Sequence, residues 1–141
     1  MNNKFKYFFI SISFTLFICS LTQECYTVKL NNKLYNHSGA LLFFLGWLNI
    51  GLKTFIWLAN PLHIISNYYL VTSQKKKLPL LLSLFALILS LLFTKAEVSY
   101  AYFGGSQGDI VNTLSGYWLW VSSITITVLY TIILNIKSIK H

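Results

Sequence analysis

The sequence predicts an all-α membrane protein in which four transmembrane helices form a small bundle. Apolar residues make up 55% of the 141 residues, charged residues make up only 10%, and the mean hydropathy is +0.61. This apolar content exceeds what a soluble domain of this length needs. The apolar residues also gather in four stretches, at 7–21, 40–72, 78–94 and 114–136. Since a helix of about 20 residues crosses a bilayer, we expect one membrane domain.

The second apolar stretch is too long for one simple crossing. Its 33 residues would extend about 50 Å as a helix, against a hydrocarbon thickness of about 30 Å. We therefore expect a crossing at 54–73 after an interfacial or re-entrant segment, and a crossing at 40–59 is the alternative. The full expected layout is helix 5–22, outer connection 23–39, interfacial segment 40–52, helix 54–73, inner loop 74–77, helix 78–94, outer loop 95–112, helix 114–136 and inner tail 137–141.

Lysine positions predict the orientation of the helices. All eleven basic residues are lysines, and such residues favour the cytoplasmic side of a membrane. With both termini inside, the cytoplasmic lysines are Lys4, Lys6, Lys75, Lys76, Lys77, Lys137 and Lys140, and the outer ones are Lys29, Lys33, Lys53 and Lys95. We therefore expect a multi-pass inner (plasma) membrane protein with both termini in the cytoplasm. Nucleic acid is not an expected partner, because the chain lacks arginine, which dominates phosphate and base recognition.

The N-terminal segment has two interpretations. Its basic start and short apolar stretch are also typical of a signal peptide. No small-x-small cleavage site follows, and Ile18 before Cys19 argues against a lipoprotein site. We favour an uncleaved first helix; cleavage would leave three. Cys19 and Cys25, six residues apart, are able to form a disulfide on an oxidising outer side, but two free thiols are the favoured interpretation.

The outer connections carry motifs that do not indicate catalysis or metal binding. Residues 36–38 spell the glycosylation acceptor Asn-His-Ser, and residues 104–109 are glycine-rich but lack the lysine of a phosphate-binding loop. The second motif is expected to be a flexible turn. Glu97 and Asp109 are more consistent with solvated charges than with a catalytic pair, and no zinc spacing is present. We expect no enzyme activity, cofactor or metal.

Polar residues in the second segment lie on one side of a helix. At 100° per residue, they fall within a sector of about 80°. The members of this polar stripe are Asn49, Lys53, Asn60, His63 and Asn67. A stripe indicates that this face meets neighbouring helices or water instead of lipid.

The pair Asn60-Pro61 is expected to kink this helix. Proline lacks the amide donor that would pair with the carbonyl of Trp57, one turn earlier. Asn60 and His63 then have two interpretations, as hydrogen-bonding groups that hold helices together or as a ligand or proton site. We favour the structural interpretation.

The fourth helix offers a packing face and aromatic anchors. We expect Ser115, Gly116 and Ser122 to form a helix-packing face against the second helix, because small residues allow backbones to approach closely. An outer aromatic belt is expected from Trp57, Tyr117, Trp118 and Trp120.

Three motifs resemble a known group of proteins. The sequences GWL at 46–48, WLANPL at 57–62 and GYWLW at 116–120 are similar to those of small, uncharacterised bacterial multi-pass inner-membrane proteins. The resemblance covers roughly residues 45–123. It implies a four-helix layout and a bacterial inner membrane, and it assigns no catalytic residue.

The sequence leaves two classes of function open. The first is a non-enzymatic interaction or accessory protein, including an immunity-type protein that shields the membrane from a toxin. It is favoured by the short loops and the lack of a catalytic constellation. The alternative is a small carrier or channel component with a polar path along the second helix. Expected partners are the lipid bilayer and either other membrane proteins or further copies of the chain.

Overall fold

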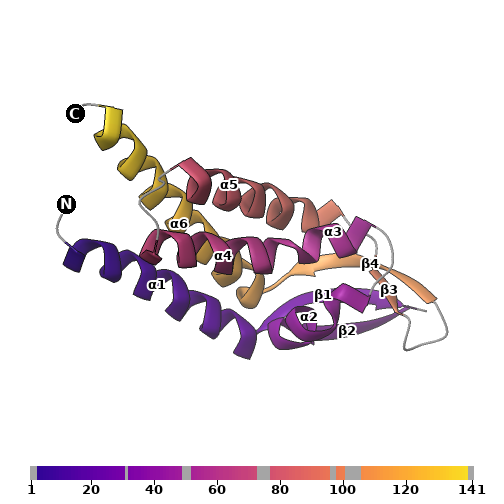
Figure 1. The fold of residues 1–141 in the computed structure, drawn as a ribbon. Coiled ribbons are helices and arrows are strands. Elements are labelled where there is room, and N and C mark those ends of the chain that lie inside the picture. The colour runs from indigo at the N-terminus through magenta and orange to yellow at the C-terminus, as the bar shows by residue number, and fades with distance from the viewer. Residues whose placement is uncertain are drawn as a thin grey trace.

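The protein combines a helical bundle with a small sheet at one end. The structure is a computed structural model, and it describes residues 3–30, 32–48, 52–72, 77–95, 98–100 and 106–139. The helices of the bundle are α1 (Asn3–Thr22), α4 (Ala59–Thr72), α5 (Lys77–Leu92) and α6 (Ser115–Ile139). Figure 1 shows both termini at one end of the bundle and the sheet at the other. Helix α6 lies centrally, because it contacts α1, α4 and α5.

The prediction of an all-α protein is wrong, because the two connections at 23–39 and 95–112 contain strands. Four strands form an antiparallel sheet in the order β2-β1-β4-β3. The strands are β1 (Glu24–Leu30), β2 (Lys33–Ser38), β3 (Val98–Tyr100) and β4 (Ser106–Thr113). The Gly-rich motif at 104–109, expected as a flexible turn, therefore contributes Ser106–Asp109 to β4.

A local signal accounts for the first pair of strands. β1 and β2 pair from Glu24 with Ser38 to Leu30 with Lys33, which leaves a two-residue connection. Asn32 in that connection has a φ of 61°, and asparagine adopts this left-handed conformation more readily than most residues. β1 is also rich in aromatic and β-branched side chains, which favour strands.

The second apolar stretch forms several short helices in place of one kinked crossing. Residues Gly39–Leu45 form α2, Gly46–Leu48 form a 3₁₀ turn and Leu52–Trp57 form α3. The helix stops at Leu58, whose amide donates to the Phe55 carbonyl at 3.1 Å, and α4 begins at Ala59. Pro61 lies in the first turn of α4, where a missing amide donor costs least. The expected kink is therefore a break between two helices, three residues before the proline.

Three of the described helices are long and apolar enough to span a membrane. They are the segments Lys4–Thr22, Lys77–Lys95 and Ser115–Ile136. The fourth member of the bundle, α4, has 14 residues and extends about 21 Å, short of a hydrocarbon thickness of about 30 Å. The prediction of four spanning helices is corrected to three candidate spans and a shorter helix packed among them.

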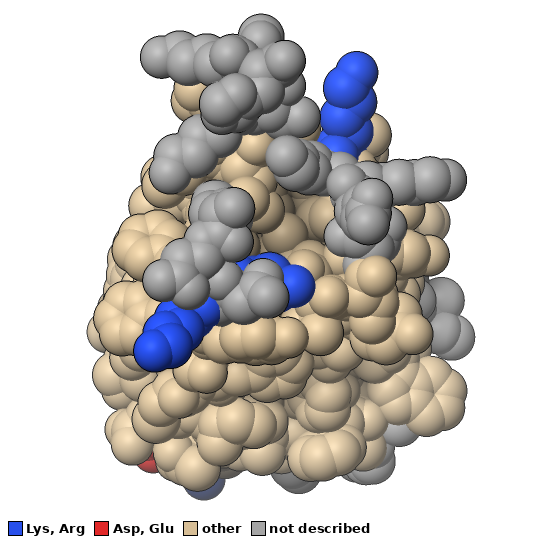
Figure 2. Space-filling model, turned by 60° about the vertical axis from the view of Figure 1, so that its left-hand side comes forward, with Lys and Arg blue, Asp and Glu red and all other residues tan. Residues whose placement is uncertain are grey.

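Exposed side chains on the bundle are mainly apolar. Phe8, Phe14 and Ile18 are exposed on α1, and Phe85 and Ile88 are exposed on α5. Figure 2 brings the end with the two termini forward, where lysines gather while most of the remaining visible surface is uncharged. Lys4 and Lys6 begin α1 at this end, and Lys77 begins α5. An apolar wall with charges at its ends matches the surroundings of a bilayer.

Buried residues join the sheet to the helices. Val28 of β1 packs in one cluster with Phe17 of α1, Ala86 of α5 and Ile124 of α6. The Tyr26 ring meets that of Phe93 at a centroid distance of 5.2 Å. The sheet therefore shares a core with the bundle instead of forming a separate domain.

Candidate functional site

The described part of the polar stripe faces the inside of the bundle. Asn60, His63 and Asn67 are all buried on α4, and Pro61 is half-buried beside them. Asn49 and the side chain of Lys53 lie outside the described residues. Of these buried side chains, His63 and Asn67 belong to a hydrogen-bonded cluster. Asn60 lines a neighbouring cavity.

The polar cluster consists of Ser13 on α1, His63 and Asn67 on α4, and Thr127 on α6. Ser13 Oγ lies 3.3 Å from His63 Nε2 and 2.9 Å from Thr127 Oγ1. Asn67 Nδ2 donates to Thr127 Oγ1 at 3.3 Å and to the His63 carbonyl at 3.0 Å. The cluster therefore connects three helices through side chains that have little contact with solvent.

The hydrogen bonds around His63 assign the position of its ring proton. Ser13 Oγ donates its proton to the Ser123 carbonyl at 3.0 Å, so it accepts from His63 Nε2–H. The other ring nitrogen, Nδ1, faces Asn67 Nδ2 at 3.4 Å and shares an N–H group that also points to the His63 carbonyl. Because Nδ1 faces a donor, this assignment places the proton of a neutral His63 ring on Nε2.

The same geometry distinguishes Ser13 from an activated nucleophile. In a serine-histidine pair that attacks a substrate, the serine hydroxyl donates to the histidine, which removes the proton. Here the Ser13 hydroxyl donates to a backbone carbonyl, and Ser13 has a relative exposure of 0%. A substrate has no access to Ser13 Oγ in this conformation.

Further hydroxyl groups link α5 to α4 and α6. Ser66 Oγ of α4 donates to the Pro79 carbonyl of α5 at 2.8 Å. Ser83 of α5 lies 3.3 Å from Thr131 of α6, measured between the hydroxyl oxygens. Such bonds stabilise helix contacts in surroundings that hold little water.

The small residues expected to pack against the second helix lie elsewhere. A Cβ atom on Gly116 would lie 2.8 Å from the Glu24 carbonyl oxygen, so this glycine faces the start of β1. Ser115 Oγ donates to Gln23 Oε1 at 3.5 Å, and Ser122 is exposed. On α6, Thr127 makes the hydrogen bond to α4, through Asn67. The sequence contained a signal for this polar face of α6, because Ser123, Thr127 and Thr131 recur every four residues.

The aromatic residues expected as an outer belt occupy different surroundings. Trp118 is exposed, whereas Tyr117 and Trp120 are buried in the core. Trp57 is half-buried, and its Nε1 donates to the Phe43 carbonyl at 2.7 Å. Trp118 and Trp120 point to different sides because residues two apart on a helix are separated by about 200°.

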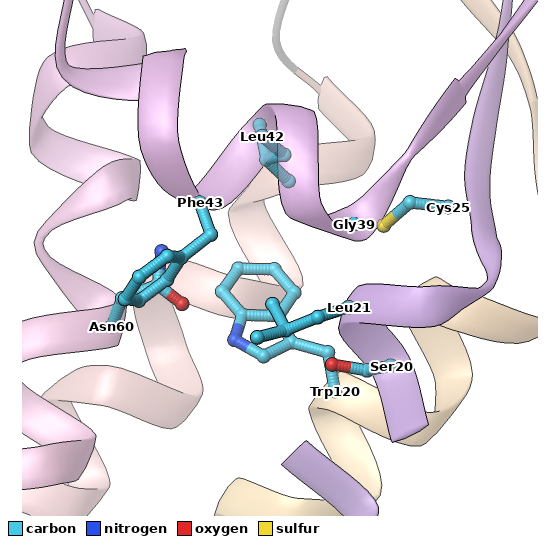
Figure 3. A pocket seen from close by; sticks show the side chains of 8 residues that line it. All are labelled: Ser20, Leu21, Cys25, Gly39, Leu42, Phe43, Asn60 and Trp120. Carbon is cyan, nitrogen blue, oxygen red and sulfur yellow. The ribbon is translucent and has the colours of Figure 1, made fainter. Parts of the chain in front are cut away.

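A small cavity lies where the sheet joins the bundle. Figure 3 shows Asn60 and Trp120 on one side of it and Cys25 and Gly39 on the other. Its volume is about 10 Å³, and the lining residues are Ser20, Leu21, Cys25, Gly39, Leu42, Phe43, Asn60 and Trp120. Five elements of the structure, α1, β1, α2, α4 and α6, therefore meet around one cavity.

Both cysteines are free thiols, Cys19 exposed and Cys25 buried. Burial raises the pKa of the Cys25 thiol to about 12. Since only the thiolate reacts, a rise of this size lowers the reactive fraction about a thousandfold near pH 8. This cysteine is suited to packing rather than to nucleophilic chemistry.

Cys25 is expected to resist alkylation in the folded protein. In a Cys19→Ser background, a maleimide at pH 8 should label Cys25 slowly before unfolding in detergent and rapidly afterwards. Equal rates in the two states would contradict the buried position. The matched Cys25→Ser variant reports the rate of Cys19 and serves as the control.

Comparison of the chain with protein family models, curated proteins and solved structures finds no match. The geometry of the described residues is therefore the basis for a functional assignment.

Proposed function

We propose that this chain is a non-enzymatic interaction or accessory protein of the bacterial inner membrane, with both termini in the cytoplasm. The supporting observation is that the polar groups of the cluster bond to one another. His63, Asn67 and Thr127 each have partners on the same or a neighbouring helix. They hold the bundle together, and a carrier would instead need groups that are free to bind a solute.

The sheet is the surface that we assign to a partner. β2 is an edge strand, and its residues Leu34 and Tyr35 are 67% and 42% exposed. An edge strand offers unpaired backbone groups, and exposed apolar side chains add contact area. With the termini in the cytoplasm, this surface faces outward. An immunity-type protein, which meets a toxin at the outer surface, is one member of the proposed class.

Photo-crosslinking in bacterial cells tests the partner surface. A photoreactive amino acid at position 34 or 35 should form adducts with a discrete protein. The same residue at position 85, on the lipid-facing side of α5, serves as the matched control and should not. Absence of protein adducts from β2, or equal adducts from position 85, would overturn the proposal.

A flux measurement tests the competing class. Proteoliposomes with the purified chain should show no pH- or solute-dependent flux above that of empty vesicles. Flux that disappears in His63→Ala while the yield of folded protein is unchanged would favour a carrier and contradict the proposal.

A further inference from the structure

A buried polar group beside the cavity has no hydrogen-bond partner among the described residues. This group is Trp120 Nε1. The side chain of Asn60, with a relative exposure of 4%, lines the same cavity. Figure 3 shows the Asn60 amide and the Trp120 indole nitrogen directed toward each other across the cavity. Buried polar groups are almost always paired, so this indole N–H needs a partner that the described residues do not supply.

The neighbouring groups define the chemistry of that partner. The indole N–H donates only, whereas the Asn60 amide has both a donor and an acceptor. Ser20 Oγ uses its own proton toward the Phe17 carbonyl at 2.6 Å, so its lone pairs are free to accept. The remaining walls include the apolar side chains Leu21, Leu42 and Phe43. The lining thus favours a neutral molecule that accepts one hydrogen bond and donates two.

The size of the cavity selects among such molecules. A water molecule needs about 10 to 15 Å³ of cavity volume and two to four polar partners. The cavity has about 10 Å³ and offers three partners, on Trp120, Asn60 and Ser20.

We propose that this cavity binds one water molecule that links Asn60 of α4, Trp120 of α6 and Ser20 of α1. The water accepts from Trp120 Nε1–H and donates to Asn60 Oδ1 and Ser20 Oγ. It thereby joins three helices at the level where the sheet begins. This gives Asn60 a role distinct from that of His63 and Asn67, whose hydrogen bonds are made directly within the protein.

Nuclear magnetic resonance of the full chain in lipid nanodiscs, with ¹⁵N-labelled tryptophan, tests this site. The Trp120 indole proton, assigned with a Trp120→Phe variant, should show a cross-peak to a long-lived water molecule. Trp57 is the matched control, because its indole N–H donates directly to the Phe43 carbonyl at 2.7 Å. A missing water cross-peak at Trp120, or a cross-peak to lipid in its place, would overturn the proposal.

Two variants separate a bridging water from one bound to the indole alone. Asn60→Leu keeps the number of side-chain heavy atoms and the branch at Cγ, removes both hydrogen-bonding atoms, and should abolish the Trp120 water cross-peak. Ser20→Ala removes one proposed partner of the water, the Ser20 hydroxyl, and leaves the Asn60 side chain in place. This variant keeps the proposal testable if Asn60→Leu fails to fold. It should shift the Trp120 indole proton and leave that of Trp57 unchanged. A cross-peak retained in Asn60→Leu, or an unchanged Trp120 resonance in Ser20→Ala, would contradict the bridge.

Discussion

Replacing Gly39 by alanine is expected to abolish most of the folded protein. Gly39 lies where β2 passes into α2, directly against the end of α1. Its amide donates to the Gln23 carbonyl at 2.9 Å, and an added Cβ atom would overlap the backbone carbonyl of Ser20. Backbone atoms cannot rotate away as a side chain can, so α1 and α2 would have to separate. We expect a loss of about 3 kcal/mol in the free energy of unfolding.

Gly46→Ala is the matched control for this prediction. The nearest atom to a Cβ at position 46 is the side-chain Cδ1 atom of Trp57, at 2.8 Å. A side chain is able to shift, so this variant should lose less stability. The measurement is the yield of monodisperse protein in detergent, followed by thermal unfolding. Equal losses in the two variants would contradict a specific backbone contact at Gly39.

Replacing Thr127 by valine is expected to weaken the packing of α6 against α1 and α4. Valine keeps the shape of threonine and removes only the hydroxyl group. That group lies 2.9 Å from Ser13 Oγ and 3.3 Å from Asn67 Nδ2, so both neighbours would lose a partner while they stay buried. We expect a cost of about 1 to 2 kcal/mol in the free energy of unfolding.

Thr125→Val provides a closely matched control on the same helix. Thr125 is half-buried, and its hydroxyl donates to the Val121 carbonyl at 2.8 Å. This bond lies within one helix, so its loss should change the free energy of unfolding by about 0.5 kcal/mol or less. Reversible unfolding in mixed detergent micelles measures both variants. Equal destabilisation would show that Thr127 acts only within its own helix.

A double-mutant cycle that combines Asn67→Leu with Thr127→Val tests the same interaction. Because Asn67 and Thr127 share hydrogen bonds, the double variant should lose less stability than the sum of the single losses. Additive losses would mean that the two side chains do not interact across the helix interface.

Several features followed from local sequence alone. Long apolar runs predicted α1, α5 and α6, since uninterrupted apolar residues of this length favour a spanning helix. The periodicity of a helix predicted that Asn60, His63 and Asn67 share a face, and in the structure all three are buried on α4. The Asn60-Pro61 pair predicted a disturbed helix one turn earlier, near Trp57, and the helix is interrupted at Leu58.

The sheet was missed because its pairing is largely non-local. Tyr26 of β1 pairs with Thr113 of β4, and no periodic pattern relates two segments so far apart in the chain. The turn at Asn32 was a usable local signal for β1 and β2, but the loops were interpreted as polar connections between helices. The apolar content of the bundle dominated that interpretation.

The sequence by itself determined which segments are apolar helices and which α4 residues share a face, because both depend on composition and on the 3.6-residue period of a helix. Only the tertiary structure decided what that face meets. Ser13 reaches His63 from 50 residues away along the chain, and Thr127 reaches Asn67 from 60 residues away. Trp120 and Asn60 line one cavity at the junction with the sheet. Such contacts depend on how the helices pack and on where the strands pair, and spacing within one segment carries no information about either.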